Sequence, residues 1–404
     1  MPDLLRKVTC REGTGDFQDR MKLLKRMPLE WRSGSLCACA LFLLFVALLA
    51  VAGCSHTSQN GPAQTLAATT FVSEAECTSC HADISKLCAG ANHSRTLHVV
   101  NRSELGALAP PVGKIPGTCY QIAGTGDRLQ FASTLGSKSE LPMDLVLGSG
   151  KLGMTYVSLD RNNQALTELR MSWYPSRKSW YLTPGQESDA DNDPGEHNEP
   201  EVSRSCMRCH AVTVPADGVR PEARFFGVGC QSCHGPASAH VEAARAGRFA
   251  DLRIDRIGSW NATRINDLCG KCHRSASKVG TSGDEVIMTQ RFQPYGLMQS
   301  PCFQKSGDTL SCITCHNPHQ NTSKNPRDFE AACLRCHSGA ASPSAGAAGH
   351  AAGAQATPGK ICPVNPRSGC IPCHMPKRKV FPVSQIPISM ADHLIWAYGK
   401  KRPH

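Results

Sequence analysis

The chain has 404 residues, a formal net charge of +11 and an aromatic content of only 6%. That aromatic content is low for the length, so part of the apolar core is expected to come from something other than side chains. A positive net charge by itself is typical of proteins that bind nucleic acids or membranes. The motifs described below give the positive charge of this chain another explanation.

The N-terminal segment predicts export. Residues 36–52 form an apolar run behind a basic stretch, which is the layout of a secretory signal. The run ends in Val51-Ala52-Gly53-Cys54, which resembles a bacterial lipobox. Residues 1–53 are therefore predicted to be a lipoprotein signal peptide, with Cys54 as the lipidated N-terminus. The alternative is an uncleaved anchor, because the run is just long enough to span a membrane.

The residue after Cys54 is Ser55, a choice that resembles outer-membrane sorting of lipoproteins. The protein is therefore expected on the periplasmic side, lipid-anchored at the outer membrane. Residues 54–73 are rich in Ser, Gln, Thr and Ala and are predicted to be a flexible tether.

Residues 74–404 are predicted to form one domain that is mainly α, with extensive loops. Within it, residues 115–185 contain alternating and β-branched segments separated by turn residues, which predict a small antiparallel β insertion. The acidic residues 187–200 are expected to be a loop, and residues 239–246 a short helix that ends at Gly247. Residues 338–360 are rich in Gly, Ala and Ser and are predicted to be a flexible insertion.

Seven copies of Cys-x-x-Cys-His occur in this domain. This is the attachment signal for c-type haem, in which two thioethers hold the porphyrin and the His binds the iron. Zinc sites also use paired cysteines, but they do not need a His directly after the second Cys. The predicted haem-attaching residues are Cys77, Cys80, Cys206, Cys209, Cys230, Cys233, Cys269, Cys272, Cys312, Cys315, Cys333, Cys336, Cys370 and Cys373. The predicted proximal ligands are His81, His210, His234, His273, His316, His337 and His374.

Seven covalent haem c groups would give the positive net charge of the chain another explanation. Each haem carries propionates that Lys and Arg can neutralise, so the net charge gives no reason to expect nucleic acid. About fifty residues per haem also means that the haems must pack closely, and the fold is expected to depend on them as small metal domains depend on their metal.

Each iron needs a second ligand unless it is open to substrate, and nine His lie outside the motifs. The strongest candidates are His93, His240, His319 and His393, which lie close to haem motifs or on predicted helices. His98 and His197 are intermediate. His56, His350 and His404 are weak candidates, and Met298 and Met375 are the alternatives to His. Four further cysteines, Cys88, Cys119, Cys302 and Cys362, can form disulfides in three pairings.

Several stretches resemble a family of bacterial multihaem cytochromes c related to the tetrahaem cytochromes of ammonia oxidation. They are Leu147-Gly-Ser-Gly-Lys, Gly227-Val-Gly-Cys-Gln-Ser-Cys-His-Gly-Pro, Arg291-Phe-Gln-Pro-Tyr-Gly-Leu-Met, Thr314-Cys-His-Asn-Pro-His and Cys373-His-Met-Pro-Lys. The resemblance implies that His93, His240, His319 and His393 occupy distal positions. The wider superfamily includes nitrite reductase and hydroxylamine oxidoreductase, but the lysine-ligated CxxCK site of the former is absent here.

Electron transfer along closely packed, mostly bis-His haems is the favoured function, because the cofactors carry the chemistry and the protein sets their spacing. The alternative is an oxidoreductase with one open haem that acts on a small nitrogen or sulfur compound, and a scaffolding role is the least favoured. No motif marks one haem as catalytic. The expected partners are other cytochromes or a quinol-linked membrane complex.

Overall fold

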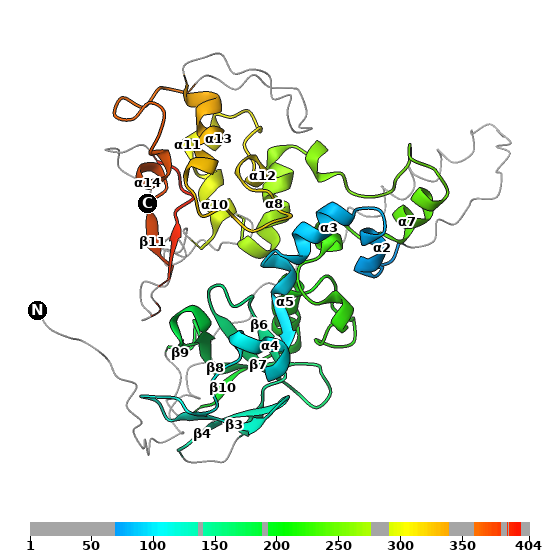
Figure 1. Ribbon diagram of the computed structural model, residues 1–404, viewed down its shortest axis with the longest axis vertical. Coiled ribbons are helices and arrows are strands. Elements are labelled where there is room, and N and C mark those ends of the chain that lie inside the picture. The colour runs from blue at the N-terminus through cyan, green and yellow to red at the C-terminus, as the bar shows by residue number, and fades with distance from the viewer. Residues whose placement is uncertain are drawn as a thin grey trace, which may run out of the picture. The chain divides into compact units, whose positions relative to one another are not determined.

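The computed structural model describes residues 69–135, 140–187, 193–275, 291–338, 359–380, 386 and 388–396 (Figure 1). All seven Cys-x-x-Cys-His motifs fall within these ranges. The predicted signal segment, most of the tether and most of the insertion at 338–360 lie outside the described residues. Within the described part of the chain, no helix is both long and apolar enough to cross a membrane.

Short helices carry the motifs, and irregular segments join them. The predicted helix at 239–246 is α7, which ends just before Gly247, where a φ of 70° suits glycine. The described helices are α2 (Glu74–Thr78), α3 (Ala82–Ala89), α4 (Arg102–Leu105), α5 (Pro200–His210), α6 (Cys230–His234), α7 (Ser238–Arg245), α8 (Ala262–His273), α10 (Gln293–Met298), α11 (Pro301–Gln304), α12 (Cys312–Cys315), α13 (Arg327–His337) and α14 (Cys370–His374).

Antiparallel sheets occupy the chain between the first and second motifs. A six-stranded sheet has the order β1-β6-β7-β8-β10 with β9 paired to β8, and a four-stranded sheet has the order β2-β3-β4-β5. Strands β11 and β12 pair beyond the seventh motif. The strands are β1 (Leu97–Val99), β2 (Gly113–Lys114), β3 (Tyr120–Thr125), β4 (Arg128–Ser133), β5 (Glu140–Pro142), β6 (Leu145–Leu147), β7 (Met154–Leu159), β8 (Leu166–Tyr174), β9 (Ser179–Leu182), β10 (Gly195–Asn198), β11 (Lys377–Lys379) and β12 (Ser389–Ala391).

The largest hydrophobic core is formed by residues of both larger sheets. Tyr120 of β3, Phe131 of β4 and Tyr156 of β7 are fully buried in it. Alternate residues of a strand reach the same face, which is why Tyr120 and Ile122 are buried while Gln121 between them is not. Burying each large side chain contributes roughly 2–3 kcal/mol, so this core can hold the sheets together by itself.

A second core joins the six-stranded sheet to the helix of the second motif. Met207 lies inside that motif on α5 and is completely buried. It belongs to one cluster with Leu145, Val157 and Leu166 of the sheet. The sheet therefore fixes the orientation of the helix that carries Cys206, and this is how the β region bears on the site.

The chain mixes helices and strands, so the expectation of a mainly α fold is not confirmed. The antiparallel strands expected within residues 115–185 are present, but the sheets also take in strands from outside that range. Strand β10 lies in the segment expected to be an acidic loop and pairs with β8 from Gly195 to Asn198. This pairing depends on backbone N–H and C=O groups. A prediction based on alternating apolar residues does not find such a strand.

Candidate haem-binding sites

Helical geometry brings together the three functional side chains of five motifs, which lie wholly within α5, α6, α8, α13 and α14. Residues i, i+3 and i+4 share one face of a helix, so both cysteines and the His of Cys-x-x-Cys-His lie on one side. Helix α6 consists of its motif alone, from Cys230 to His234, and α8 carries its motif as the last helical turn. In the first and fifth motifs the helix ends before the His, at Thr78 and at Cys315. One porphyrin edge can therefore meet both thiols and the imidazole at once.

Backbone carbonyl groups orient four of the motif histidines through their Nδ1 atoms. The Nδ1–oxygen distances are 2.8 Å for His210 with Thr96, 2.8 Å for His234 with Asp255, 2.7 Å for His337 with Lys360 and 2.9 Å for His374 with Trp396. A carbonyl oxygen only accepts hydrogen bonds, so Nδ1 carries the hydrogen and Nε2 keeps its lone pair. Metal-binding histidines are commonly held in this way.

Two histidines outside the motifs are held by the same kind of bond. His240 Nδ1 lies 2.8 Å from the carbonyl oxygen of Leu252, and His393 Nδ1 lies 3.0 Å from that of Ala391. Burial lowers the pKa of His393 to about 4. Burial also lowers the pKa of His273 and of His316. The rings of His393, His273 and His316 are thus kept in the neutral form that binds metal ions.

Four histidine rings from outside the motifs face motif histidines. The centroid distances are 6.4 Å for His81 with His240, 6.0 Å for His273 with His93, 6.4 Å for His234 with His319 and 6.2 Å for His316 with His393. Every one of these contacts joins one motif His to one His outside the motifs. The four outside residues are the same four that the sequence ranked as the strongest distal candidates.

The other candidates for distal ligands have different surroundings. His98 Nε2 lies 2.8 Å from the carbonyl oxygen of Arg95 and therefore donates a hydrogen bond. His197 lies in β10 with its Nδ1 3.4 Å from the Thr167 hydroxyl. Within the described ranges, neither ring contacts a motif His.

Two methionines and three histidines complete the set of sequence candidates. Met298 ends α10, and Met375 follows α14 directly. His56, His350 and His404 lie outside the described residues. Among the residues that the structure describes, no second His ring faces the motif histidines His210, His337 and His374.

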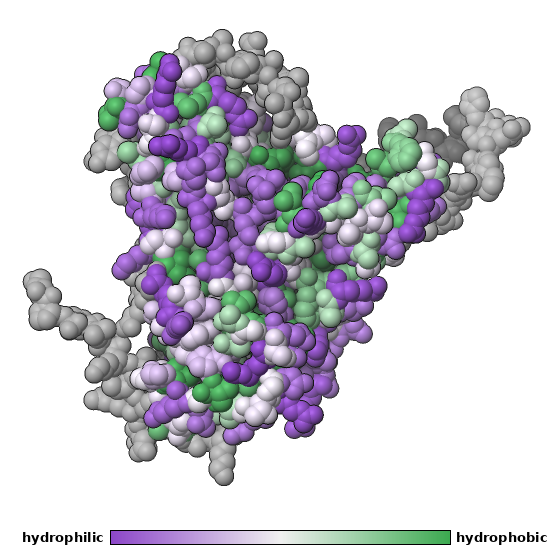
Figure 2. Space-filling model, in the orientation of Figure 1, coloured by the Kyte–Doolittle hydropathy of each residue, from purple (hydrophilic) through white to green (hydrophobic). Residues whose placement is uncertain are grey.

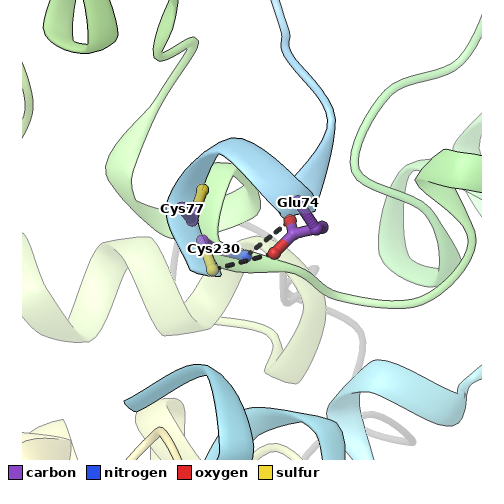
Figure 3. Close-up of side chains that lie close together, drawn as sticks. All are labelled: Glu74, Cys77 and Cys230. Carbon is purple, nitrogen blue, oxygen red and sulfur yellow. Dashed lines mark hydrogen bonds between the residues drawn. The ribbon is translucent and has the colours of Figure 1, made fainter. Parts of the chain in front are cut away.

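Cysteines of different motifs lie side by side, as Figure 3 shows for the first and third motifs. The ligand atoms of Glu74, Cys77 and Cys230 all lie within 4.8 Å of one another. Glu74 accepts hydrogen bonds from the backbone N–H of Cys230 at 3.1 Å and from its thiol at 2.9 Å. Such a cluster can hold a metal ion, but its two thiols are the first cysteines of two motifs. The arrangement therefore indicates two haem-attachment sites packed together.

Neighbouring thiols link other motifs in the same way. The interactions join Cys209 to Cys272, Cys269 to Cys312, and Cys333 to Cys370. The neighbouring Cys272 thiol lowers the pKa of Cys209 to about 7. Together with the contact in Figure 3, these pairs mean that each of the seven motifs meets at least one other.

Exposed hydrophobic side chains lie beside several motifs. Ile84 and Leu87 of α3, which follows the first motif, are 43% and 45% exposed. Val202 precedes the second motif by about a turn, and Ile361 and Val364 precede the seventh. Figure 2 shows hydrophobic surface where α3 lies. Covering apolar surface gains about 25 cal/mol per Å², so a flat apolar group placed at these motifs would stabilise the fold. The residues present thus fit a porphyrin.

Of the cysteines outside the motifs that the structure describes, Cys88, Cys119, Cys302 and Cys362 are free thiols, so none of their three pairings forms. Cys119 is buried in the core of the two larger sheets, which gives it a packing role. Cys88, Cys302 and Cys362 are partly buried.

No protein-family model matches the chain, and no curated protein matches it. Two solved structures are similar. The outer cell wall cytochrome OcwA is 15% identical, with a TM-score of 0.43 over 80% of this chain and 79% of that one. The undecahaem cytochrome from the S-layer of Carboxydothermus ferrireducens is 16% identical, with a TM-score of 0.39 over 76% of this chain and 51% of that one. These likenesses are too weak to establish a shared fold. The link to the nitrite reductase and hydroxylamine oxidoreductase superfamily stays a prediction.

Proposed function

We propose that this chain is an exported c-type cytochrome that carries seven covalent haems and passes electrons along them to redox partner proteins. The observation that carries the proposal is the set of four ring contacts, each between a motif His and a His outside the motifs. When bound, each haem supplies a one-electron redox centre. The role of the polypeptide is to attach each haem, to bind its iron and to set the distances between haems.

The ring separations suit an iron held between two imidazoles. An imidazole nitrogen binds a metal ion at about 2 Å and the ring centre lies roughly 1 Å further back, so two ligating rings have centres about 6 Å apart. The four observed distances run from 6.0 to 6.4 Å. The angles between ring planes range from 7° to 65°, and ligation allows this because each ring can turn about its bond to the metal.

We therefore assign distal ligands to four of the seven sites. In each site one ring comes from the motif helix, and the second comes from elsewhere in the chain. The proximal and distal pairs are His81 with His240, His273 with His93, His234 with His319, and His316 with His393.

The thiol contacts give the proposed haems a continuous order. They join the first motif to the third, the fourth to the fifth and the sixth to the seventh. Burial, and after it the nearby Cys269 of the fourth motif, raise the pKa of Cys233 in the third motif to about 11, so these two motifs are neighbours as well. Arg335 of the sixth motif donates a hydrogen bond to the carbonyl of Thr314 in the fifth, at 3.0 Å. The second motif joins the fourth, so haems attached here would form a chain with one branch, an arrangement that suits a carrier.

Electron paramagnetic resonance of the fully oxidised protein tests whether it is a carrier. We expect only low-spin ferric signals: each of the four assigned imidazole pairs holds an iron with two strong ligands, and a carrier needs a second strong ligand at the other three irons as well. A stoichiometric high-spin signal would instead indicate an open iron. The reduced protein would then be mixed anaerobically with nitrite, hydroxylamine, tetrathionate or sulfite. Saturable reoxidation by one of them would favour the oxidoreductase.

The lipid anchor at Cys54 is part of the proposal and has its own test. Changing Cys54→Ala should move the protein from the membrane fraction into the soluble periplasmic fraction, because lipidation requires that thiol. Cys37→Ala and Cys39→Ala are matched controls that remove a thiol from the same apolar run and should leave the protein membrane-bound. If the Cys54→Ala protein stays in membranes, the run itself anchors the chain.

A further inference from the structure

One contact recurs where motifs meet. In three motifs, the side chain three residues before the first cysteine accepts a hydrogen bond from the backbone N–H of the first cysteine in another motif. These bonds run from Cys230 to Glu74 at 3.1 Å, from Cys312 to Asn266 at 2.9 Å and from Cys370 to Glu330 at 3.0 Å. None of these three side chains is predicted to be functional from the sequence, although all three lie three residues before the first cysteine of a motif.

Helix geometry explains the spacing. Residues three apart lie on one face of a helix, so Asn266 and Cys269 of α8 reach the same neighbour together. That neighbour is the start of α12, and the first N–H groups of a helix have no partner within it. The side chain from the other motif supplies one. In all three places the thiols of the two first cysteines also interact with each other.

These side chains are built into the junctions. Asn266 is fully buried and Glu330 is only 7% exposed. Glu74 reaches its partner because residue 229 is a glycine: any side-chain carbon at Gly229 would collide with the Glu74 carboxylate. Polar side chains that only face solvent would not lie between two motifs in this way.

The second motif provides a contrast within the same chain. Its corresponding residue, Ser203, accepts a hydrogen bond from the backbone N–H of Leu166 and donates one to the carbonyl of Asn198, both at 3.0 Å. Ser203 therefore binds the sheet and not another motif. The second motif meets the fourth through second cysteines, Cys209 and Cys272. Among the motifs, all of which the structure describes, this backbone-to-side-chain hydrogen bond therefore occurs only where the first cysteines of two motifs meet.

We propose that Glu74, Asn266 and Glu330 are positioning residues that dock haem sites in pairs and tune the reduction potentials of those pairs. This inference rests on the proposed function. Charge and hydrogen bonding near a haem set its potential, and the attraction between opposite charges grows as they approach. A carboxylate stabilises the ferric form, which carries more positive charge, and so lowers the potential. A neutral amide such as Asn266 does not.

The test uses the holoprotein and conservative substitutions. Glu330→Gln and Glu74→Gln keep an oxygen acceptor for the backbone N–H but remove the charge, and Asn266→Asp adds one. Glu104→Gln is the matched control, because Glu104 is exposed on α4 and bonds Asn101 instead of a motif. Intact mass first establishes the haem content of each protein, and an optical redox titration then measures the midpoints.

We expect Glu330→Gln to raise the midpoints of about two-sevenths of the haem absorbance, and Glu74→Gln to do the same for another two-sevenths, because each residue serves one pair. Asn266→Asp should lower the midpoints of a third pair. Proteins that keep seven haems but whose midpoints move no more than those of Glu104→Gln would overturn the inference. A wild-type protein without covalent haem would overturn the proposed function instead, so the two failures are distinguishable.

Discussion

Replacing His393 by alanine should turn one of the seven haems high-spin and leave six low-spin. The His393 ring is partly buried and faces that of His316 at 6.2 Å. Removing it would therefore leave one iron without its second imidazole. The high-spin ferric signal should integrate to one iron per molecule. His98→Ala is the matched control, because the Nε2 atom of His98 already bonds the Arg95 carbonyl.

A fully low-spin spectrum for His393→Ala would contradict the assignment of that ligand. His93→Ala, His240→Ala and His319→Ala should behave alike, each affecting one different haem. Because the four pairs use eight different rings, the effects should add when substitutions are combined. Two substitutions that affected the same haem would show that one of the pairs is wrong.

Without haem, the helices that bury no residue should unfold while the two larger sheets stay folded. Helices α2, α3, α12 and α14 contain no buried residue, so they gain little from packing against protein alone. The sheets have their own core, in which Tyr120, Phe131 and Tyr156 are fully buried. Short isolated helices are marginal in water, whereas that core does not depend on a porphyrin.

Hydrogen exchange measures this difference region by region. Protein produced without haem attachment should keep slow exchange in β7 and β8 and lose it in α2, α3, α12 and α14. The holoprotein is the control and should be protected in both regions. Equal protection of the helices with and without haem would contradict the claim that haem supplies their core.

The sequence was most informative where chemistry demands fixed residue types. The motif spacing predicts seven haem-attachment sites. Proximity to these motifs is why His93, His240, His319 and His393 are stronger candidates for distal ligands than the other histidines. The partner of each could not be predicted, because it depends on how distant segments dock. His319 follows the fifth motif in the chain but faces His234 of the third, and His240 follows the third but faces His81 of the first.

The sheets were predicted only in part for a similar reason. Alternating apolar residues revealed strands such as β7, whose side chains are buried. Strand β10 has mostly polar residues and exists because its backbone pairs with β8. Glu74, Asn266 and Glu330 were missed because a polar residue on a helix has no special meaning until its partner in another motif is known.

Intact mass of the mature protein, purified from a host that attaches haem to exported chains, tests the central claim most directly. We expect the mass of the polypeptide with its lipid on Cys54 plus seven haems, which stay attached after denaturation because the thioethers are covalent. A bare polypeptide, or a chain that binds zinc under native conditions and releases it on denaturation, would contradict it.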